Sequence, residues 1–483
     1  MRWTSVSAET NTRRGSPLSE KVYAHFIGAG GAGMSGIALV LSQRGMCVTG
    51  SDLKESRYSR ALVAGGVPVH IGHSAEHLGD PEVVVISSAI PETNPELAEA
   101  RRRGLPVWPR ARMLAHLAGD RNTIAVAGTH GKTSTSSMVA TMLSRMGLEP
   151  SFLIGGEVDG FDTNAVNGAG AHYVVEADES DGSFLFMEPH VAVITNVEAD
   201  HLDHYGTLAC VEEAFLAFMS RVPADGALVV CGDDARLVEL AVGADRRTVT
   251  YGFNEACDVR CRILERDSTG LRFEVTLRDG TTVSSVTRIP GTHMVSNATA
   301  ALATAWTLGL DVETAAQAVG EFTGVRRRFD LVGEVAGVTI VDDYAHHPTE
   351  VRATLQAADS LGFERVFVLF QPHRYSRTES LAGDFGDAFA CADRVALMDV
   401  YSAGEAPIPG VSGKTILETL LRKHPRAQAA YLPHRSDIVS YLCSRVRPGD
   451  LVMTMGAGDV TAVGPELARA LSARAGDAAS TCQ

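Results

Sequence analysis

The sequence predicts an α/β protein built from several mostly parallel sheets, and three observations support this fold class. Short runs of β-branched residues alternate with Ala- and Leu-rich amphipathic stretches along the whole chain. The 483 residues, 45% of them hydrophobic, can bury several cores, and about one domain per 150 residues suggests three domains. Glycine-rich turns join an apolar run to a helix-like stretch at residues 28–33 and 128–133, which is typical of doubly wound sheets.

The bulk composition excludes several classes of partner. A net charge of -15 argues against a nucleic-acid partner, because binding to the phosphate backbone relies on clustered Lys and Arg. The eight cysteines are scattered, which predicts free thiols in a reducing cytosol. No run approaches the ~18 to 20 apolar residues that cross a bilayer. We therefore expect a cytoplasmic protein with small-molecule ligands and no membrane insertion.

Turn-forming and linker-like segments, together with the order of the motifs, divide the chain into an extension and three blocks. Residues 1–20 have no apolar core of the length that a signal peptide requires, so we expect a disordered N-terminal extension there. The first domain is predicted at residues 21–120 and ends near a linker rich in Arg and Pro. The central domain is predicted at 121–323 and the C-terminal domain at 324–483.

The loop at residues 128–133 has the features of a polyphosphate cradle. It follows the predicted strand 124–127 and precedes the predicted helix 134–143. Backbone N–H groups and the positive end of a helix dipole favour negative charge there, Lys132 can reach terminal phosphates, and the Thr133 hydroxyl can ligate Mg²⁺. An ordinary surface turn is the alternative. The loop predicts ATP binding by Gly128, Thr129, His130, Gly131, Lys132, Thr133 and Ser134.

A second glycine loop, at residues 28–33, follows the predicted strand 22–27. Its glycines allow a diphosphate to approach the backbone, and an acidic residue follows at a distance suited to a ribose. Taken alone, this pattern would suggest that the loop binds NAD. The loop could instead be a tight turn that only packs the helix against the strand. The residues predicted to contact the diphosphate ligand are Gly28, Gly30, Gly31, Gly33 and Asp52, together with Ser87 and Ser88 after the strand 83–86.

Two acid-rich loops follow predicted strands of the central block. Residues 176–181 come directly after the strand 173–175, and residues 196–204 come directly after the strand 191–195. Mg²⁺ prefers oxygen ligands and is usually held jointly by one or two side chains and the phosphates, so loops of this kind beside a phosphate loop predict a magnesium site. A solvated acidic surface is the alternative. The predicted metal ligands are Thr133, Glu176 and His201.

The C-terminal block contributes further polar loops at strand ends. The planar guanidinium groups of Arg374 and Arg377 suit a small carboxylate substrate and its reaction partner. His346 and His347 have no third ligand at a spacing that suits a metal, so we predict that they contact substrate or form hydrogen bonds. Structural histidines are the alternative.

A basic run, Arg326-Arg327-Arg328, lies at the predicted hinge before the C-terminal block. A cation there could swing onto the ATP phosphates when two domains close. A solvated basic turn is the alternative. Arg326 of this run and Asp343 of the C-terminal block are predicted to contact ATP from outside its loop.

With these motifs in place, the chain resembles the Mur ligase family from about residue 22 to 464. The resemblance implies three domains: a Rossmann-like UDP-binding domain, a central P-loop-type ATPase domain with a mostly parallel sheet, and a C-terminal Rossmann-like domain. It also implies a cytoplasmic enzyme of peptidoglycan synthesis whose first glycine loop holds a UDP diphosphate rather than NAD. The motifs that carry the resemblance lie at 28–36, 128–133, 176–181, 198–201, 344–349, 370–377 and 456–459.

The resemblance implies a specific reaction. The lactyl carboxylate of UDP-N-acetylmuramate attacks the γ-phosphate of ATP, and the amine of L-alanine then displaces phosphate from the acyl phosphate. Charge accumulates on phosphoryl oxygens, so Lys132 and Mg²⁺ would act by electrostatic stabilisation and positioning. The catalytic residues it implies are Lys132, His201, Arg374 and Arg377, and Tyr344, His346, Arg374 and Arg377 would bind the amino acid.

The chain departs from the family pattern at two points. Family members often have His-Asn where this chain has His293-Met294, although Asn297 remains available for an adenine contact. Several members use a carbamylated lysine after the acidic-histidine loop, but no lysine lies between His201 and Val222, so we do not predict that modification.

Three other functions remain open at this point, and so does the oligomeric state. A ligase that attaches an intact tripeptide to the same UDP-sugar would share most of these motifs. An NAD-dependent dehydrogenase would explain only the first glycine loop, and a nucleotide-gated binding module would bind ATP without turnover. We expect a monomer or a homodimer.

Overall fold

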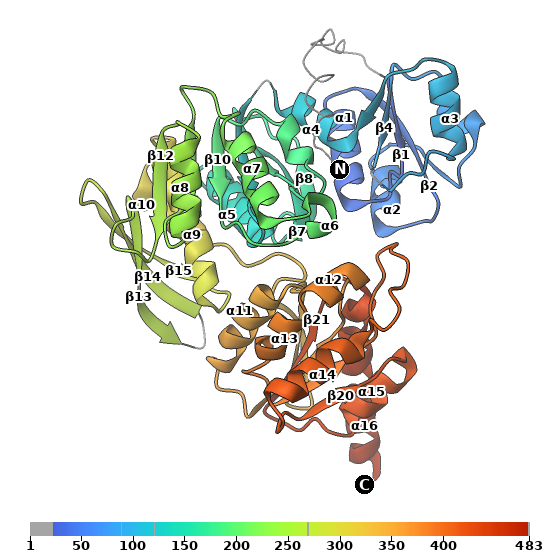
Figure 1. The fold of residues 1–483 in the computed structure, drawn as a ribbon, viewed down its shortest axis with the longest axis vertical. Coiled ribbons are helices and arrows are strands. Elements are labelled where there is room, and N and C mark those ends of the chain that lie inside the picture. The colour runs from blue at the N-terminus through green and yellow to red at the C-terminus, as the bar shows by residue number, and fades with distance from the viewer. Residues whose placement is uncertain (1–22, 88, 120, 268–269, 482–483) are drawn as a thin grey trace. The chain divides into compact units, whose positions relative to one another are not determined.

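The structure is a computed structural model that describes residues 23–87, 89–119, 121–267 and 270–481. The predicted extension at 1–20 and the predicted contact Ser88 lie outside the described residues. The chain divides into two compact units (Figure 1). The first ends at Arg121 and also includes Pro150–Gly155 and Asn164–Gly170, and the second contains the rest.

The first unit contains a parallel five-stranded sheet in the order β3-β2-β1-β4-β5. The central strand, β1, is buried because its side chains are covered on both faces, as the apolar run predicts. The strand order reverses at β1, so the loop that follows it lies at the switch point where such sheets bind ligands. The strands are β1 (Tyr23–Ile27), β2 (Cys47–Asp52), β3 (Val69–Ile71), β4 (Val83–Ile86) and β5 (Val107–Pro109), and the helices are α1 (Ala32–Gln43), α2 (Arg57–Ala64), α3 (Pro95–Arg102) and α4 (Arg110–Ala118).

A buried carboxylate links three elements of the first unit. Glu96, in the first turn of α3, is fully buried, and its Oε2 accepts hydrogen bonds from His25 Nε2 and Ser51 Oγ, each at 2.7 Å. Its Oε1 lies 3.0 Å from His73 Nδ1. Burial opposes the charged form, but the hydrogen bonds from the imidazoles and the hydroxyl outweigh it and lower the pKa of Glu96.

Replacing Glu96 with alanine should destabilise the first unit by about 3–5 kcal/mol, because it leaves the buried His25 and Ser51 without their acceptor. Hydrogen-exchange mass spectrometry on peptides from β1 and β2 measures this loss in the first unit alone. Glu92→Ala is the matched control, since that side chain is 69% exposed. Equal protection in the two variants would show that the carboxylate does not stabilise this sheet.

The second unit contains most of a ten-stranded sheet in the order β15-β14-β13-β12-β11-β10-β6-β9-β7-β8. Its strand β6 pairs in parallel with β9 on one side and β10 on the other, so the loops after these three strands emerge at the same edge. The strands are β6 (Asn122–Ala127), β7 (Ser151–Val158), β8 (Thr163–Val166), β9 (His172–Glu176), β10 (Val191–Ile194), β11 (Ala227–Cys231), β12 (Thr248–Gly252), β13 (Val259–Asp267), β14 (Gly270–Leu277) and β15 (Thr282–Thr287).

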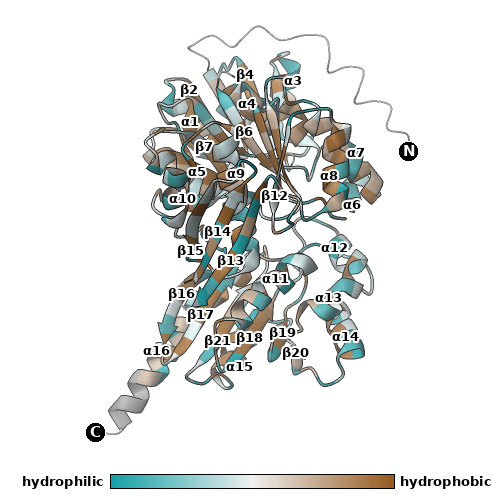
Figure 2. Cartoon of the chain, turned by 90° about the vertical axis from the view of Figure 1, so that its left-hand side faces the viewer, coloured by the Kyte–Doolittle hydropathy of each residue, from teal (hydrophilic) through white to brown (hydrophobic). Residues whose placement is uncertain are grey.

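Helices cover this sheet, and its far end is antiparallel. The far end consists of β13, β14 and β15, which pair antiparallel. Their alternation of apolar and polar residues is visible as mixed colours along β13 and β14 in Figure 2. The helices of this region are α5 (Lys132–Arg145), α6 (Leu202–Tyr205), α7 (Leu208–Met219), α8 (Ala235–Gly243), α9 (Thr292–Thr307) and α10 (Val312–Gly320).

The C-terminal part of the second unit contains a six-stranded sheet in the order β16-β17-β21-β18-β19-β20. Only the pair of β16 and β17 is antiparallel, and the edge strand β16 was not predicted. The strands are β16 (Asp330–Val335), β17 (Val338–Asp343), β18 (Arg365–Phe370), β19 (Arg394–Leu397), β20 (Ala429–Tyr431) and β21 (Asp450–Met455). The helices are α11 (Pro348–Asp359), α12 (Tyr375–Ser380), α13 (Ala382–Ala388), α14 (Gly413–Lys423), α15 (Arg435–Cys443) and α16 (Val463–Thr481).

The predicted fold class is confirmed: the chain is α/β, with mostly parallel sheets in three domains. Strand β19 ends at Leu397, and soon after it the Asp399 side chain accepts hydrogen bonds from the N–H groups of Val400 and Gly413. None of the helices in the described part of the chain has the length and apolar character needed to cross a membrane. The predicted domain boundaries stay predictions.

Candidate active site

The loop between β6 and α5 has the backbone of an anion cradle. Gly128 and Gly131 adopt positive φ angles of +135° and +78°, which favour glycine. A Cβ at Gly128 would lie 2.1 Å from Thr195 Oγ1, so a side chain at that position would collide with the end of β10. The α5 helix begins at Lys132 with no side-chain cap, so its N-terminal N–H groups face the loop.

Lys132 folds back over this loop. Its Nζ donates to the carbonyl oxygens of Gly128 at 2.5 Å and Thr129 at 3.2 Å, and it lies 2.8 Å from Glu179 Oε1. Burial opposes the charge on Lys132, but the Glu179 carboxylate outweighs it and raises the lysine pKa. Lys132 is therefore a charged ammonium held within the cradle, and its partner Glu179 was missed by the sequence analysis.

The predicted metal ligands converge on the same place. The Thr133 hydroxyl donates to Glu176 Oε1 at 3.1 Å, and His201 Nε2 lies 3.8 Å from Glu179 Oε1. His201 occupies the N-cap position before α6, in the left-handed conformation with φ of 54°. Burial lowers the pKa of His201, so its imidazole is neutral and can donate a lone pair. The loops after β6, β9 and β10 thus bring these groups together around Lys132.

A cavity of about 370 Å³ opens beside the cradle, within the size range of small-molecule sites. Asn297 of α9 is buried on its wall, and a Cβ at Gly131 would lie 2.9 Å from Asn297 Oδ1. Asn297 Nδ2 donates a long hydrogen bond of 3.9 Å to the sulfur of Met294. Of the residues predicted to bind ATP, the cavity wall includes His130, Gly131, Ser134, Asn297 and Asp343.

Asp343, on this wall, accepts hydrogen bonds from the backbone. Its Oδ1 and Oδ2 accept hydrogen bonds from the N–H groups of Ala345 at 2.8 Å and Phe329 at 2.7 Å. Burial raises the pKa of Asp343 to about 6, against the opposing effect of the Arg328 guanidinium. The side chain therefore ties the backbone before β16 to the backbone after β17 while it lines the cavity.

The basic run presents a different arginine to the cavity from the one predicted. The Arg326 side chain is 60% exposed, pairs with Glu157 at 3.4 Å, and does not line the cavity. Arg328 does line it and lies 3.6 Å from Glu350 of α11. Three adjacent arginines carry no signal that tells which one turns inward, so sequence analysis could not select Arg328. The role of Arg326 stays a prediction.

A second, smaller cavity of about 190 Å³ lies between the loop after β10 and α12. Asp200, His201, Arg374 and Arg377 are on its wall. Arg377 Nη2 donates to both carboxylate oxygens of Asp200 at 3.1 Å, and Arg374 Nη1 lies 3.2 Å from Asp203 Oδ2. Although burial opposes ionisation, Arg377 lowers the pKa of Asp200. The two predicted carboxylate-binding arginines thus lie beside the predicted metal ligand His201.

Tyr344 and His346 lie nearby but line neither of these two cavities. His346 is partly buried, its Nδ1 is 3.0 Å from the Tyr344 carbonyl oxygen, and desolvation lowers its pKa to about 3. The ring of His346 makes an edge contact with that of His373 at 5.8 Å. Their predicted contacts with the amino acid stay predictions.

In the first unit, the glycine loop is hydrogen-bonded to Asp52, the acidic residue predicted to lie beside it. Gly30 N–H donates to Asp52 Oδ2 at 2.8 Å, and a Cβ at Gly30 would lie 2.9 Å from that oxygen. A Cβ at Gly28, which has φ of +84°, would lie 3.4 Å from Ser87 Oγ. The structure therefore brings Gly28, Gly30, Asp52 and Ser87 together after β1.

The same loop ends at the N-terminus of α1, where a cation is present. Gly31 occupies the N-cap position, and a Cβ at Gly33 would lie 2.2 Å from Arg110 Nη1. The guanidinium of Arg110 therefore reaches the positive end of the helix, where an anion is favoured. Arg110 was missed because it belongs to the Arg- and Pro-rich linker, whose charges have no local pattern that points to this loop.

Family comparisons agree with this arrangement. The Mur ligase family catalytic domain matches residues 23–122, the Mur ligase middle domain matches 126–305, and the Mur ligase glutamate ligase domain matches 327–458. The chain belongs to the Mur ligase family. The phosphate loop and both acid-rich loops fall in the middle domain of this Mur ligase, and Arg374 and Arg377 fall in its third matched domain.

Two relatives of this Mur ligase resemble it over nearly their whole length. A protein of Pelotomaculum thermopropionicum named UDP-N-acetylmuramate–L-alanine ligase is 48% identical over 94% of this chain and 98% of its own. A protein of the same name from Rubrobacter xylanophilus is 49% identical over 92% of this chain and 98% of its own.

Two solved structures resemble the Mur ligase fold of this chain. The crystal structure of UDP-N-acetylmuramate–alanine ligase from Thermotoga maritima has a TM-score of 0.79 at 29% identity and covers 94% of this chain and 100% of its own. A murein peptide ligase from Psychrobacter arcticus has a TM-score of 0.71 at 26% identity and covers 93% of this chain and 99% of its own.

Proposed function

We propose that this chain joins L-alanine to the lactyl carboxylate of UDP-N-acetylmuramate and converts ATP to ADP and phosphate, as a cytoplasmic step of peptidoglycan synthesis. The observation that carries the proposal is the match to ligases of that name over nearly the whole chain, at 48% and 49% identity, combined with the convergence of Lys132, Thr133, Glu176 and His201. The first glycine loop lies in a Mur ligase domain, which favours a UDP diphosphate over NAD.

The residues around Lys132 fit a magnesium ion. The hydroxyl of Thr133 and the carboxylate of Glu176 are hard oxygen donors 3.1 Å apart, and Glu179 Oε2 is buried with no hydrogen-bond partner among the described residues. Thr133, Glu176 and His201 would hold the ion. When bound with ATP, it would supply charge neutralisation for the phosphoryl oxygens.

The chain's own groups account for the first chemical step. The N–H groups at the start of α5 and the ammonium of Lys132 stabilise charge as the substrate carboxylate attacks the γ-phosphate. The product of this step is an acyl phosphate, a far better acyl donor than the carboxylate. The cavity beside the cradle, with Asn297 and Arg328 on its wall, accommodates the nucleoside end of ATP.

The smaller cavity suits the second substrate. It has room for a small amino acid, and Arg374, which is 32% exposed, can bind its carboxylate. Arg377 is held rigidly by Asp200, so it fixes that wall of the cavity. The amine of L-alanine would then attack the acyl phosphate beside His201, and phosphate would leave.

The same fold is used by the murein peptide ligase of Psychrobacter arcticus, so an intact tripeptide is the second candidate amine donor. An assay of ADP release with purified chain, ATP, Mg²⁺ and UDP-N-acetylmuramate separates the two. We expect release with L-alanine and little with L-alanyl-γ-D-glutamyl-meso-diaminopimelate, with glycine and L-serine as size controls. Release only with the tripeptide would overturn the proposal in favour of the second candidate.

A further inference from the structure

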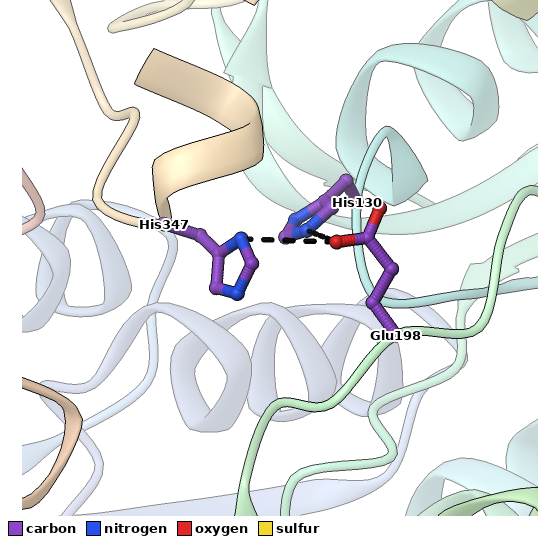
Figure 3. A group of neighbouring side chains, drawn as sticks. All are labelled: His130, Glu198 and His347. Atoms are coloured by element: carbon purple, nitrogen blue, oxygen red, sulfur yellow. Dashed lines mark ion pairs between the residues drawn. The ribbon is translucent and has the colours of Figure 1, made fainter. Parts of the chain in front are cut away.

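Three side chains outside the predicted magnesium site gather at the far end of the phosphate loop (Figure 3). His130 comes from the loop itself, Glu198 from the loop after β10, and His347 from the residue before α11. One donor atom from each lies within 4.8 Å of the other two. His130 Nε2 is 3.5 Å and His347 Nδ1 is 4.0 Å from the same oxygen, Glu198 Oε2.

The donor atoms of this group are oriented as a metal requires. His347 Nδ1 accepts a hydrogen bond of 3.3 Å from the Thr349 N–H, so this nitrogen is unprotonated, and a bound cation would take the place of that hydrogen bond on its single lone pair. Its ring is 5% exposed, and its Nε2 has no hydrogen-bond partner among the described residues. His130 Nε2, which points at Glu198, is likewise buried without a hydrogen-bond partner in the described structure.

A second layer of groups supports the first. His130 Nδ1 lies 3.4 Å from Glu350 Oε1, and the Thr349 hydroxyl donates to Glu198 Oε2 at 2.8 Å. Metal-bound histidines usually have a carboxylate on their other ring nitrogen, and metal-bound carboxylates are usually hydrogen-bonded in turn.

We propose that His130, Glu198 and His347 form a binding site for a transition-metal cation such as Zn²⁺, separate from the magnesium site. Two imidazoles and one carboxylate suit Zn²⁺ or Co²⁺, whereas Mg²⁺ prefers the oxygen-rich set around Thr133 and Glu176. A cation here would link the phosphate loop to α11 across the nucleotide cavity, whose wall includes His130 and Glu198. It would therefore slow the opening of this cavity, through which ADP leaves and ATP enters. Such a cation would inhibit the enzyme, which is a function separate from the proposed ligation.

Titration of the full chain with Co²⁺, in excess Mg²⁺ and without nucleotide, tests this site by a signal independent of activity. The wild type should develop the strong visible absorption of low-coordinate Co²⁺ and saturate at one ion per chain. His347→Asn should weaken that binding by about tenfold or more, because it removes one ligand. Asparagine is a good N-cap, so α11 keeps its first-turn hydrogen bond.

The matched control is His201→Asn, which removes a histidine from the predicted magnesium site and leaves this group intact. It should keep the wild-type Co²⁺ spectrum. A spectrum that survives in His347→Asn, or that disappears in His201→Asn, would place the ion at the magnesium site and overturn the proposal, as would a wild type with no such spectrum. Glu198→Gln provides a second variant should His347→Asn fail to fold, and we expect the same weakening from it.

Discussion

Replacing Lys132 with alanine should lower the rate of ADP formation by about 10²-fold or more while the fold is retained. The ammonium lies inside the phosphate loop, where it contacts two loop carbonyls and Glu179. Its removal takes away charge stabilisation as the γ-phosphate is transferred. The measurement is steady-state ADP release at saturating ATP, UDP-N-acetylmuramate and L-alanine.

The variant should fold because its buried partner can become neutral. Burial raises the pKa of Glu179 to about 7 even with Lys132 in place, so without the lysine the carboxyl takes up a proton and leaves no buried charge. Lys414→Ala is the matched control, since Lys414 lies on the exposed start of α14. Near-normal turnover in Lys132→Ala, with unchanged thermal stability, would contradict the role of Lys132.

Replacing Arg377 with alanine should destabilise the second unit by about 3–5 kcal/mol and raise the KM for L-alanine, because it leaves Asp200 buried without its cation. Urea unfolding and steady-state kinetics measure the two effects. Arg374→Ala, whose ion pair with Asp203 is partly exposed, should cost about 1 kcal/mol or less in stability.

A double variant separates the structural from the functional part of this effect. Arg377→Ala combined with Asp200→Asn should recover much of the stability, since no buried charge remains unpaired, but it should not restore the KM for L-alanine. Equal stability of Arg377→Ala and the wild type would show that the pair with Asp200 does not hold the loop after β10 to α12.

The parts of the site that sequence analysis could predict are those carried by local pattern. Lys132 and Thr133 follow a strand and a glycine turn, so their place at a helix N-terminus comes from a contiguous motif. Glu176 and His201 follow two other strands, and because parallel strands end at one edge, their meeting with Thr133 could be inferred without coordinates.

The parts that it could not predict depend on contacts between distant segments. Glu179 is one of several acids in its loop, and only the folded loop shows that it is the one that binds Lys132. His347 lacked a third metal ligand by spacing, yet the fold supplies Glu198 and His130 from positions about 150 or more residues away. The edge strand β16 was missed because its half-exposed side chains lack the apolar run of a central strand.

The most direct test of the account is the position of the metal in crystals of the chain grown with Mn²⁺ and a non-hydrolysable ATP analogue, located by anomalous scattering. We expect a metal peak within coordination distance of Thr133 Oγ1 and Glu176, with the terminal phosphates against Lys132 and the adenosine in the cavity beside Asn297. A nucleotide bound elsewhere, or a nucleotide with no metal beside Thr133 and Glu176, would contradict the central claim that these strand-end loops form one magnesium–ATP site.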